Sequence, residues 1–166
     1  MPSSGGHILM STQAAVLEWT PITPEEPENW IEDEAPPSQS NHHFDALEME
    51  IESAQRISDL KDDWDGEGSP GYVKSTLDRA IVFLRMQAEW LWERCNIDPP
   101  SPRINPGPAG SIDLYWKQPS WELLINVPQD ETRPASFYGD DFGTHAIKGS
   151  MDITKPNLGL LIWLMK

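Results

Sequence analysis

The chain is poor in cysteine, in positive charge and in long hydrophobic runs, and each shortage excludes a class of protein. Its one cysteine, Cys95, cannot form an internal disulfide framework or a thiolate zinc cluster, and a single thiol is typical of the reducing cytosol. The longest apolar stretch, residues 160–165, is far too short to cross a bilayer, and the N-terminus lacks the basic and apolar regions of a signal peptide. We therefore expect a soluble cytoplasmic protein that does not associate with membranes.

Negative charge outweighs the scarce positive charge, and it is concentrated at the front of the chain. The 166 residues include 27 Asp and Glu against 12 Lys and Arg, a net charge of −15. Residues 1–63 contribute −12 of this charge and residues 64–166 only −3. This asymmetry is typical of an acidic tail attached to an ordinary domain. Because no basic patch is present, we expect no direct binding of nucleic acid, and the charge favours a basic protein partner.

Residues 1–43 have the composition of a flexible acidic tail. Repeated prolines interrupt a segment rich in Glu, Ser, Thr and Gln, which lacks the apolar surface that would offset the entropy cost of ordering. Trp19 and Trp30 are candidate anchors for a partner, since tryptophan is frequent among the residues that dominate binding energy. The acids expected to steer that encounter are Glu25, Glu26, Glu28, Glu32, Asp33 and Glu34. Alternatively, the tryptophans are incidental in a disordered leader, or the tail is a processed segment.

Two stretches after the tail have helical periodicity. Apolar residues recur every three or four positions over residues 44–60, and a longer pattern with a broad apolar face covers residues 73–94. Such a face is typical of a helix packed against a sheet or against several helices. Asn96 and the prolines after it are expected to end the second helix. We also expect Cys95, which continues the apolar stripe, to be a buried and inert thiol.

The period then changes from helical to alternating, which predicts strands. Residues 112–117 and 121–127 alternate apolar and polar side chains on either side of a short turn, the pattern of a β-hairpin with one buried face. Two further short strands are expected over residues 135–138 and 145–151. The strands together predict a four-stranded antiparallel meander.

The C-terminal residues 156–165 fit either a helix or a strand. Thr154 as the N-cap favours a short helix, whereas Gly159 and Ile162 weaken it. The whole pattern predicts one α+β domain over residues 44–166: two helices packed on a four-stranded antiparallel sheet, behind the acidic N-terminal tail.

Four acids, one tryptophan and two glycines are packed into residues 62–68, between the two expected helices. Read from Asp63, the spacing matches the first half of an EF-hand calcium loop. The match then fails, because Pro70 and Lys74 stand at positions 8 and 12 and the bidentate Glu that closes such a site is missing. The spacing therefore does not predict a calcium loop.

We expect instead that these residues form an ordered turn between the helices. Trp64 would bury its ring and set the angle between the helices, Asp65 would form an Asx turn, and the glycines would take positive φ. Ser69 with Pro70 would then start the second helix. A partner-contact role for Trp64 is the alternative that stays open.

Other candidate sites are few. No nucleophile elbow, phosphate-binding loop, dinucleotide fingerprint or zinc-ligand spacing occurs in the sequence, so we expect no catalytic residue, metal ligand or cofactor. The open alternative is a divalent-metal-dependent enzyme or metal sensor that uses Asp63, Asp65 and Glu67. Asp140 and Asp141 would join this site if the fold brought them close, and otherwise they belong to a solvated loop.

The acidic turn also supports a resemblance. The run D-W-D-G-E-G at residues 63–68 is followed by Pro70 and a long apolar helix. With the strands at residues 111–117 and 136–139, this run resembles the W-D-G-x-G turn of a group of small, uncharacterised bacterial and phage proteins. The resemblance covers residues 57–152 and leaves the acidic tail out. Genes of that group sometimes lie near toxin–antitoxin or phage-defence genes, so it implies such a setting and transfers no catalytic residue.

The favoured hypothesis is a non-catalytic, acidic protein-binding component of a bacterial regulatory or defence system. It would be an inhibitor, an antitoxin or a regulated accessory subunit that meets a basic partner with its tail and first helix. The sequence leaves the oligomeric state open.

Deletion of residues 1–43 is expected to weaken binding to such a partner, because it removes Trp19, Trp30 and the steering acids. The affinities of the full and truncated chains are compared by surface plasmon resonance at low and high salt, since salt screens electrostatic steering. Equal affinities under both conditions would exclude the tail from the interface.

Overall fold

The structure of this chain is a computed structural model, and it describes residues 42–165. The predicted acidic tail therefore lies almost entirely outside the described residues. The same holds for most of the predicted partner contacts, which stay predictions: Trp19, Trp30, Glu25, Glu26, Glu28, Glu32, Asp33 and Glu34.

Two helices lie where the apolar periodicity predicts them. α1 spans Asp45–Ala54, between 3-10 turns at His42–Phe44 and Gln55–Asp59, and α2 spans Lys74–Cys95. Their buried apolar side chains recur at helical spacing: Leu47, Ile51, Ala54 and Ile57 in the first stretch, and Leu77, Ile81, Leu84, Ala88 and Leu91 in the second. The helical predictions are confirmed. The described residues contain no helix with the length and apolarity that a bilayer crossing requires.

Both ends of α2 lie within one residue of the predicted bounds, residues 73–94, but the residues expected to start the helix are not the ones that do so. Asn96 takes the left-handed conformation with φ of 53° and ends the helix, as expected. The helix begins at Lys74, after Val73, and not at Ser69 with Pro70. The reason is local, because the Ser69 hydroxyl donates to the Asp65 carboxylate inside the preceding loop.

The sheet has five antiparallel strands instead of the predicted four. They are β1 (Arg103–Pro106), β2 (Ile112–Gln118), β3 (Trp121–Val127), β4 (Ala135–Asp140) and β5 (Ala146–Met151), in the spatial order β1-β2-β3-β4-β5. The unpredicted strand, β1, lies in the proline-rich connector, where a short segment ending in proline has no alternating pattern. It is an edge strand, in which Ile104 lies opposite Leu114 and donates its N–H to Glu50 Oε1 of α1 at 2.9 Å. A side chain of α1 thus satisfies an amide at this edge.

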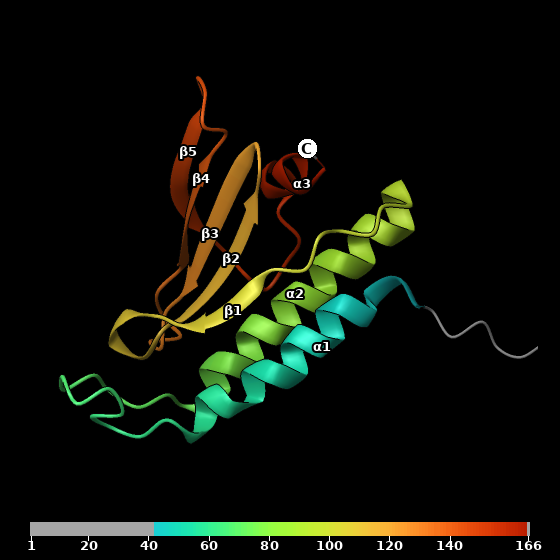
Figure 1. The fold of residues 1–166 in the computed structure, drawn as a ribbon. Coiled ribbons are helices and arrows are strands. Elements are labelled where there is room, and N and C mark those ends of the chain that lie inside the picture. Colours follow the sequence, from blue (N-terminus) through green and yellow to red (C-terminus); the bar gives the residue numbers. More distant parts are fainter. Residues whose placement is uncertain (1–41, 166) are drawn as a thin grey trace, which may run out of the picture. The chain divides into compact units, whose positions relative to one another are not determined.

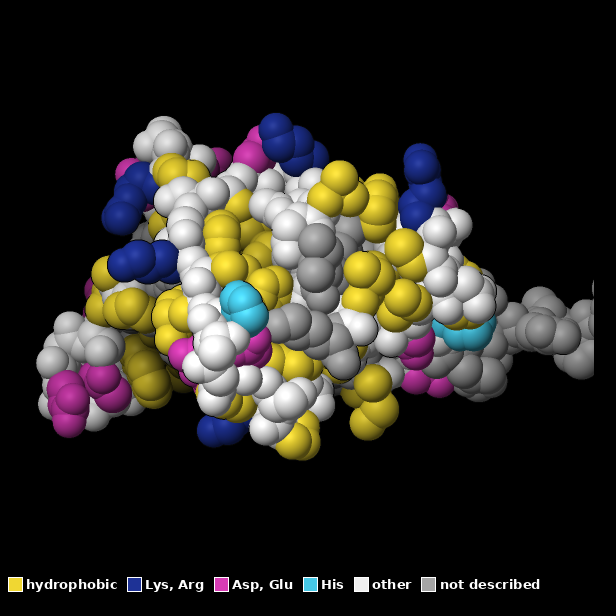
Figure 2. Space-filling view, turned by 90° about the horizontal axis from the view of Figure 1, so that it is seen from above, with side chains coloured by type: hydrophobic (Ala, Val, Ile, Leu, Met, Phe, Trp, Pro, Cys, Tyr) yellow, Lys and Arg dark blue, Asp and Glu magenta, His cyan; other side chains and the backbone are white. Residues whose placement is uncertain are grey.

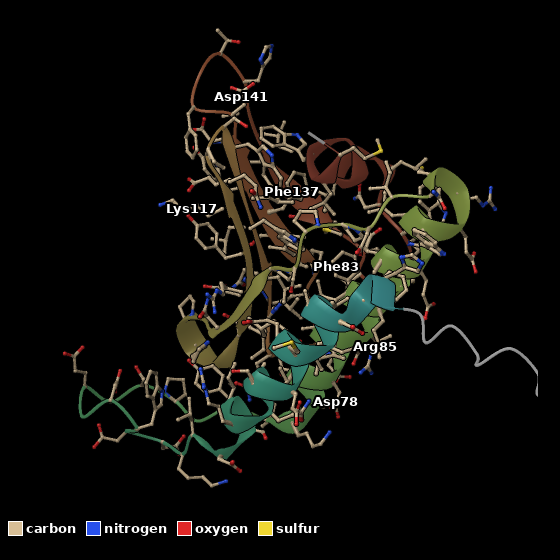
Figure 3. The ribbon with its side chains drawn as sticks, turned by 45° about the vertical axis from the view of Figure 1, so that its right-hand side comes forward. Asp78, Phe83, Arg85, Lys117, Phe137 and Asp141 are labelled. Atoms are coloured by element: carbon tan, nitrogen blue, oxygen red, sulfur yellow. The ribbon has the colours of Figure 1, made fainter. Side chains whose placement is uncertain are left out.

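A third helix, α3 (Leu158–Leu164), lies at the C-terminal end of the described residues. α1, α2 and α3 all lie on the same side of the sheet (Figure 1). On β2 and β3 this inner face consists of buried residues: Ile112, Leu114, Trp116, Trp121, Leu123, Ile125 and Val127. Figure 3 shows Phe83 of α2 and Phe137 of β4 on the helix side of the sheet, with Lys117 directed away from it. The predicted alternation of inward and outward residues is confirmed.

α3 decides between the two predictions for the C-terminal segment in favour of a helix. Its first amides are capped by Asn157 and not by Thr154. Asn157 Oδ1 accepts from the backbone N–H groups of Gly159 and Leu160, at 3.0 and 3.3 Å. The Thr154 hydroxyl instead donates to Asp152 Oδ1 at 2.6 Å, within the preceding turn.

Gly139 on β4 leaves room for α3 against the sheet. It lies opposite Leu123, on the inner face, and a Cβ at this position would lie 3.4 Å from the ring of Trp163. The same Cβ would lie 3.1 Å from Ile147 Cγ1 and 3.3 Å from Leu123 Cδ1, so a larger residue would first have to push these two side chains aside.

Cys95 is exposed, so the predicted burial of its thiol is wrong. It is the last residue of α2, one turn beyond the fully buried Leu91. The apolar spacing in the sequence extends to Cys95, but the last turn of the helix no longer packs against the core.

Asn157→Ala is expected to lower the free energy of unfolding by about 1 kcal/mol, because two amides of α3 lose their acceptor. Urea unfolding followed by tryptophan fluorescence measures this change. Asn157→Asp keeps the acceptor and places a negative charge at the helix N-terminus, so it should retain the stability of the natural chain. If Thr154→Val lowers the free energy of unfolding and Asn157→Ala does not, Thr154 is the cap and the assignment to Asn157 is wrong.

Candidate functional site

The acidic residues between the helices form a closed loop that extends beyond the ends of α1 and α2 (Figure 1). Its two ends are joined by the Tyr72 N–H, which donates to the Leu60 carbonyl at 3.1 Å. A second bond runs from the Asp63 N–H to the Ser69 carbonyl at 2.7 Å. Residues 61–71, which we call the acidic loop, are therefore held at their base and across their middle.

Side-chain carboxylates supply the remaining bonds of the acidic loop. Asp62 Oδ1 accepts from the Gly71 N–H at 2.7 Å, and Asp63 Oδ1 accepts from the Gly68 N–H at 2.8 Å. Asp65 Oδ1 accepts from the Glu67 N–H at 3.0 Å, which is the predicted Asx turn. Hydrogen bonds from the Ser69 hydroxyl and from the Glu67 amide lower the pKa of Asp65. Each of the three aspartates thus closes part of the turn.

The glycines of the acidic loop serve two purposes: two of them take a positive φ, and one allows a close approach of the backbone. Gly66 and Gly68 have φ of 73° and 83°, which confirms the expected positive values. Gly71 is required for a different reason, because a Cβ there would lie 2.9 Å from the Leu60 carbonyl oxygen. Gly71 therefore permits the close approach to Leu60, and the other two glycines take their positive φ without strain.

Trp64 is 43% exposed, so the prediction that it buries its ring and sets the angle between the helices is wrong. Tyr72 takes the buried position instead, with 8% of its surface exposed and its hydroxyl donating to the Gly107 carbonyl at 2.7 Å. The Trp64 ring meets the Tyr72 ring edge-on, with a centroid distance of 6.2 Å. The alternative role of Trp64, as a surface contact, is the one its exposure permits.

The structure does not bring the two groups of predicted acids together. Figure 3 shows Asp141 at the tip of the β4–β5 hairpin, at the end of the sheet away from the acidic loop. There Asp140 Oδ1 accepts from the Phe142 N–H at 2.7 Å, and Asp141 Oδ1 from the His145 N–H at 3.0 Å. Within residues 42–165, no group of three or more His, Cys, Asp or Glu side chains is placed to hold a metal ion.

A polar cluster that the sequence did not predict lies at the end of the sheet opposite the tip of the β4–β5 hairpin. Asn126 Nδ2 on β3 donates to Asp113 Oδ1 on β2 and to the Ser111 hydroxyl, both at 2.6 Å. Ser111 and Asn126 line a cleft of about 590 Å³ that also includes Gln129 and Arg133. The signal for part of this cluster was present, since Asp113 and Asn126 occupy outward positions of the predicted hairpin and lie opposite each other in it.

The cluster contains one group with altered acidity. Burial raises the pKa of Asp113, and the hydrogen bond from Asn126 opposes this effect. A carboxyl with a raised pKa beside a cleft is a candidate acid or base. The neighbouring Ser111 hydroxyl, however, donates to the Pro108 carbonyl at 2.7 Å and not to a base that would activate it.

The close packing around Gly107 indicates what the cluster does. A Cβ at Gly107 would lie 2.5 Å from the Ser111 hydroxyl oxygen and 2.8 Å from Asp113 Oδ1. The cluster thus clamps the connection between β1 and β2 against the sheet, and Tyr72 binds the same connection from the base of the acidic loop. Its role in this structure is to position neighbouring segments.

The outer face of the sheet, away from the helices, is exposed as well as the acidic loop. A row across the five strands places Tyr115, Leu124 and Tyr138 side by side between Arg103 and Lys148. The two tyrosine hydroxyls donate to carboxylates of the same face, Glu122 at 2.6 Å and Asp140 at 2.7 Å, which raises the pKa of both tyrosines. These aromatic side chains are therefore already engaged with their neighbours.

Comparisons with models of protein families, with curated proteins and with solved structures found no match to this chain. The function must therefore be argued from its own residues.

The raised pKa of Asp113 predicts a pH dependence of stability. The folded chain holds the Asp113 proton more tightly than the unfolded chain, so ionisation of this group lowers stability as the pH rises above its ordinary pKa of 3.8. The Asp113→Asn variant lacks this ionisation, and its melting temperature relative to the natural chain should increase between about pH 3 and pH 7.

Asp130 provides a control of opposite sign. Hydrogen bonds from Thr132 lower the pKa of Asp130, so its ionised form stabilises the fold above the window in which it titrates. The melting temperature of Asp130→Asn relative to the natural chain should therefore fall over the same pH range. A pH-independent offset for Asp113→Asn would show that the raised pKa is wrong.

Proposed function

We propose that this protein is a non-catalytic, acidic protein-binding component of a bacterial regulatory or defence system, and that the acidic loop is part of its binding surface. The observation that carries this proposal is the position of Trp64, a large aromatic side chain 43% exposed on a loop whose backbone is closed by hydrogen bonds. Burial of an exposed tryptophan in a partner pocket is a frequent source of binding energy.

The rigidity of the loop strengthens the argument. A flexible loop must lose conformational entropy when it binds, whereas a loop already held in one shape loses little. Asp62, Asp63 and Asp65 each accept a backbone N–H within the loop or at its base. Trp64 is therefore presented to solvent on a preformed turn.

The charge around Trp64 indicates the chemistry of the partner. Figure 2 shows acidic side chains at the surface of the acidic loop, at the left end of the view. Glu67, three residues after the tryptophan, is exposed, and hydrogen bonds from Ser69 and from the Glu67 amide lower the pKa of Asp65. A partner surface with lysines or arginines around an apolar pocket would complement this arrangement.

Within this function, the chain acts as an inhibitor, an antitoxin or a regulated accessory subunit. The support for this setting is the resemblance of the acidic turn to the W-D-G-x-G turn of small bacterial and phage proteins. The three possibilities share one requirement, a protein partner that recognises the loop.

Trp64→Ala is expected to weaken partner binding by about 30-fold, the loss typical of a residue that dominates an interface. The full chain is first used to capture the partner from the source cells, and the purified pair is then measured by isothermal titration calorimetry. Trp64→Phe should retain part of the affinity, because it keeps an aromatic ring. Glu67→Gln should lower the association rate and its dependence on salt.

Phe142→Ala is the matched control, because Phe142 is an aromatic residue 54% exposed on the hairpin at the other end of the sheet. It should bind the partner as the natural chain does. Urea unfolding checks that Trp64→Ala stays folded, with a loss within about 1 kcal/mol for a half-exposed side chain. If folded Trp64→Ala binds the partner with natural affinity, the acidic loop is not the binding surface.

A further inference from the structure

A separate cavity lies where α1, the second half of α2 and the proline-rich segment before β1 come together. Its volume is about 260 Å³. Most of its lining is apolar and includes Leu47, Leu84, Ala88, Pro100, Trp116 and Leu164. The Trp116 indole N–H, which is a possible polar contact, already donates to the Pro100 carbonyl at 2.7 Å.

Gln87 is the exception in this apolar lining. It belongs to α2, lines the cavity and is 4% exposed. Both polar atoms of its side chain, Nε2 and Oε1, are buried without a hydrogen-bond partner. Buried polar side-chain atoms are nearly always paired, so an unpaired amide on a residue that lines a cavity calls for a ligand that pairs with it. Both amide atoms are inaccessible to water in this conformation, so the side chain must rotate toward the cavity to make that pair.

The chemistry of Gln87 specifies that ligand. A carboxamide offers a donor and an acceptor side by side, and a second amide group matches both at once. An apolar cavity of about 150 Å³ accommodates benzene, so this cavity has room for a ring of that size with an amide attached. We propose that the cavity binds a small, neutral ring compound that carries a carboxamide or a lactam, with Gln87 pairing to its amide.

The surrounding charge argues against an acid as the ligand. A carboxylic acid would also match a carboxamide, but it is ionised at neutral pH. His43 and Asp98 are the titratable side chains in the lining, and the Asp98 carboxylate would repel a second carboxylate bound there. An amide has the same shape without the charge.

Benzamide, benzoate and toluene test the proposal as three probes of one shape. The full, ¹⁵N-labelled chain is titrated with each probe, and the Trp116 indole N–H and Gln87 side-chain amide signals are followed by NMR. Benzamide should give saturable shifts of both signals and should bind at least about 10-fold more tightly than benzoate or toluene, the factor that one good hydrogen bond supplies.

Gln87→Met replaces the amide with an apolar chain of similar length. Removal of an unpaired polar group leaves the fold intact, so the variant should melt at or above the temperature of the natural chain. It should bind benzamide about 10-fold more weakly and toluene unchanged. Thr76→Val is the matched control, because Thr76 Oγ1 is also buried and unpaired on α2 but does not line the cavity. This variant should bind benzamide as the natural chain does.

Three results would overturn the proposal. The first is equal affinity of the natural chain for benzamide and toluene, a comparison that does not depend on any variant folding. The second is unchanged affinity of Gln87→Met for benzamide. Finally, a marked loss of stability in Gln87→Met without saturable benzamide shifts in the natural chain would show that ordered water pairs with the amide.

Discussion

The burial of one face of the β2–β3 hairpin beneath α2 is the interaction on which the rest of the structure depends. Leu77 and Leu91 on the helix and Leu114 and Leu123 on the strands have no exposed surface. Each such side chain contributes roughly 1.5–3 kcal/mol when it leaves water. This packing fixes both ends of α2 and both ends of the hairpin. Tyr72, just before α2, is placed by it against the β1–β2 connection, and the acidic loop takes its position from Tyr72.

The acidic residues of this chain do more than supply charge. In the acidic loop, three aspartates accept backbone N–H groups and close the turn. Elsewhere the same device recurs at Asp130, Asp140 and Asp152, each of which accepts the amide two residues further on, at 2.9, 2.7 and 2.9 Å. Shape and charge of the acidic loop are thereby coupled, since neutralising one of its carboxylates would weaken the turn and also lower the negative charge of the loop surface.

Much of the fold could be predicted because its signals are local. The periodicity of both helices, the left-handed Asn96 and the alternation of β2 and β3 depend on neighbours a few residues apart. β1 could not be predicted, because it is a strand only by virtue of pairing with β2 and of the Glu50 carboxylate from α1. The candidate site divides in the same way. The Asx turn and the positive φ of the loop glycines were predictable, whereas the exposure of Trp64 was not, because it depends on Tyr72 filling the buried position from the far end of the loop.

The sequence by itself determined α1 and α2, the hairpin with its buried face, the shape-forming residues of the acidic turn and the excess of negative charge. These follow from backbone preferences and from the spacing of apolar residues, which act over one or two turns of chain. Only the tertiary structure decided which side chains are exposed, which are buried and which lie apart. It exposed Trp64 and Cys95, buried Gln87 beside a cavity and separated Asp141 from the acidic loop. Exposure and pairing depend on segments distant in sequence, and no local pattern records where those segments meet.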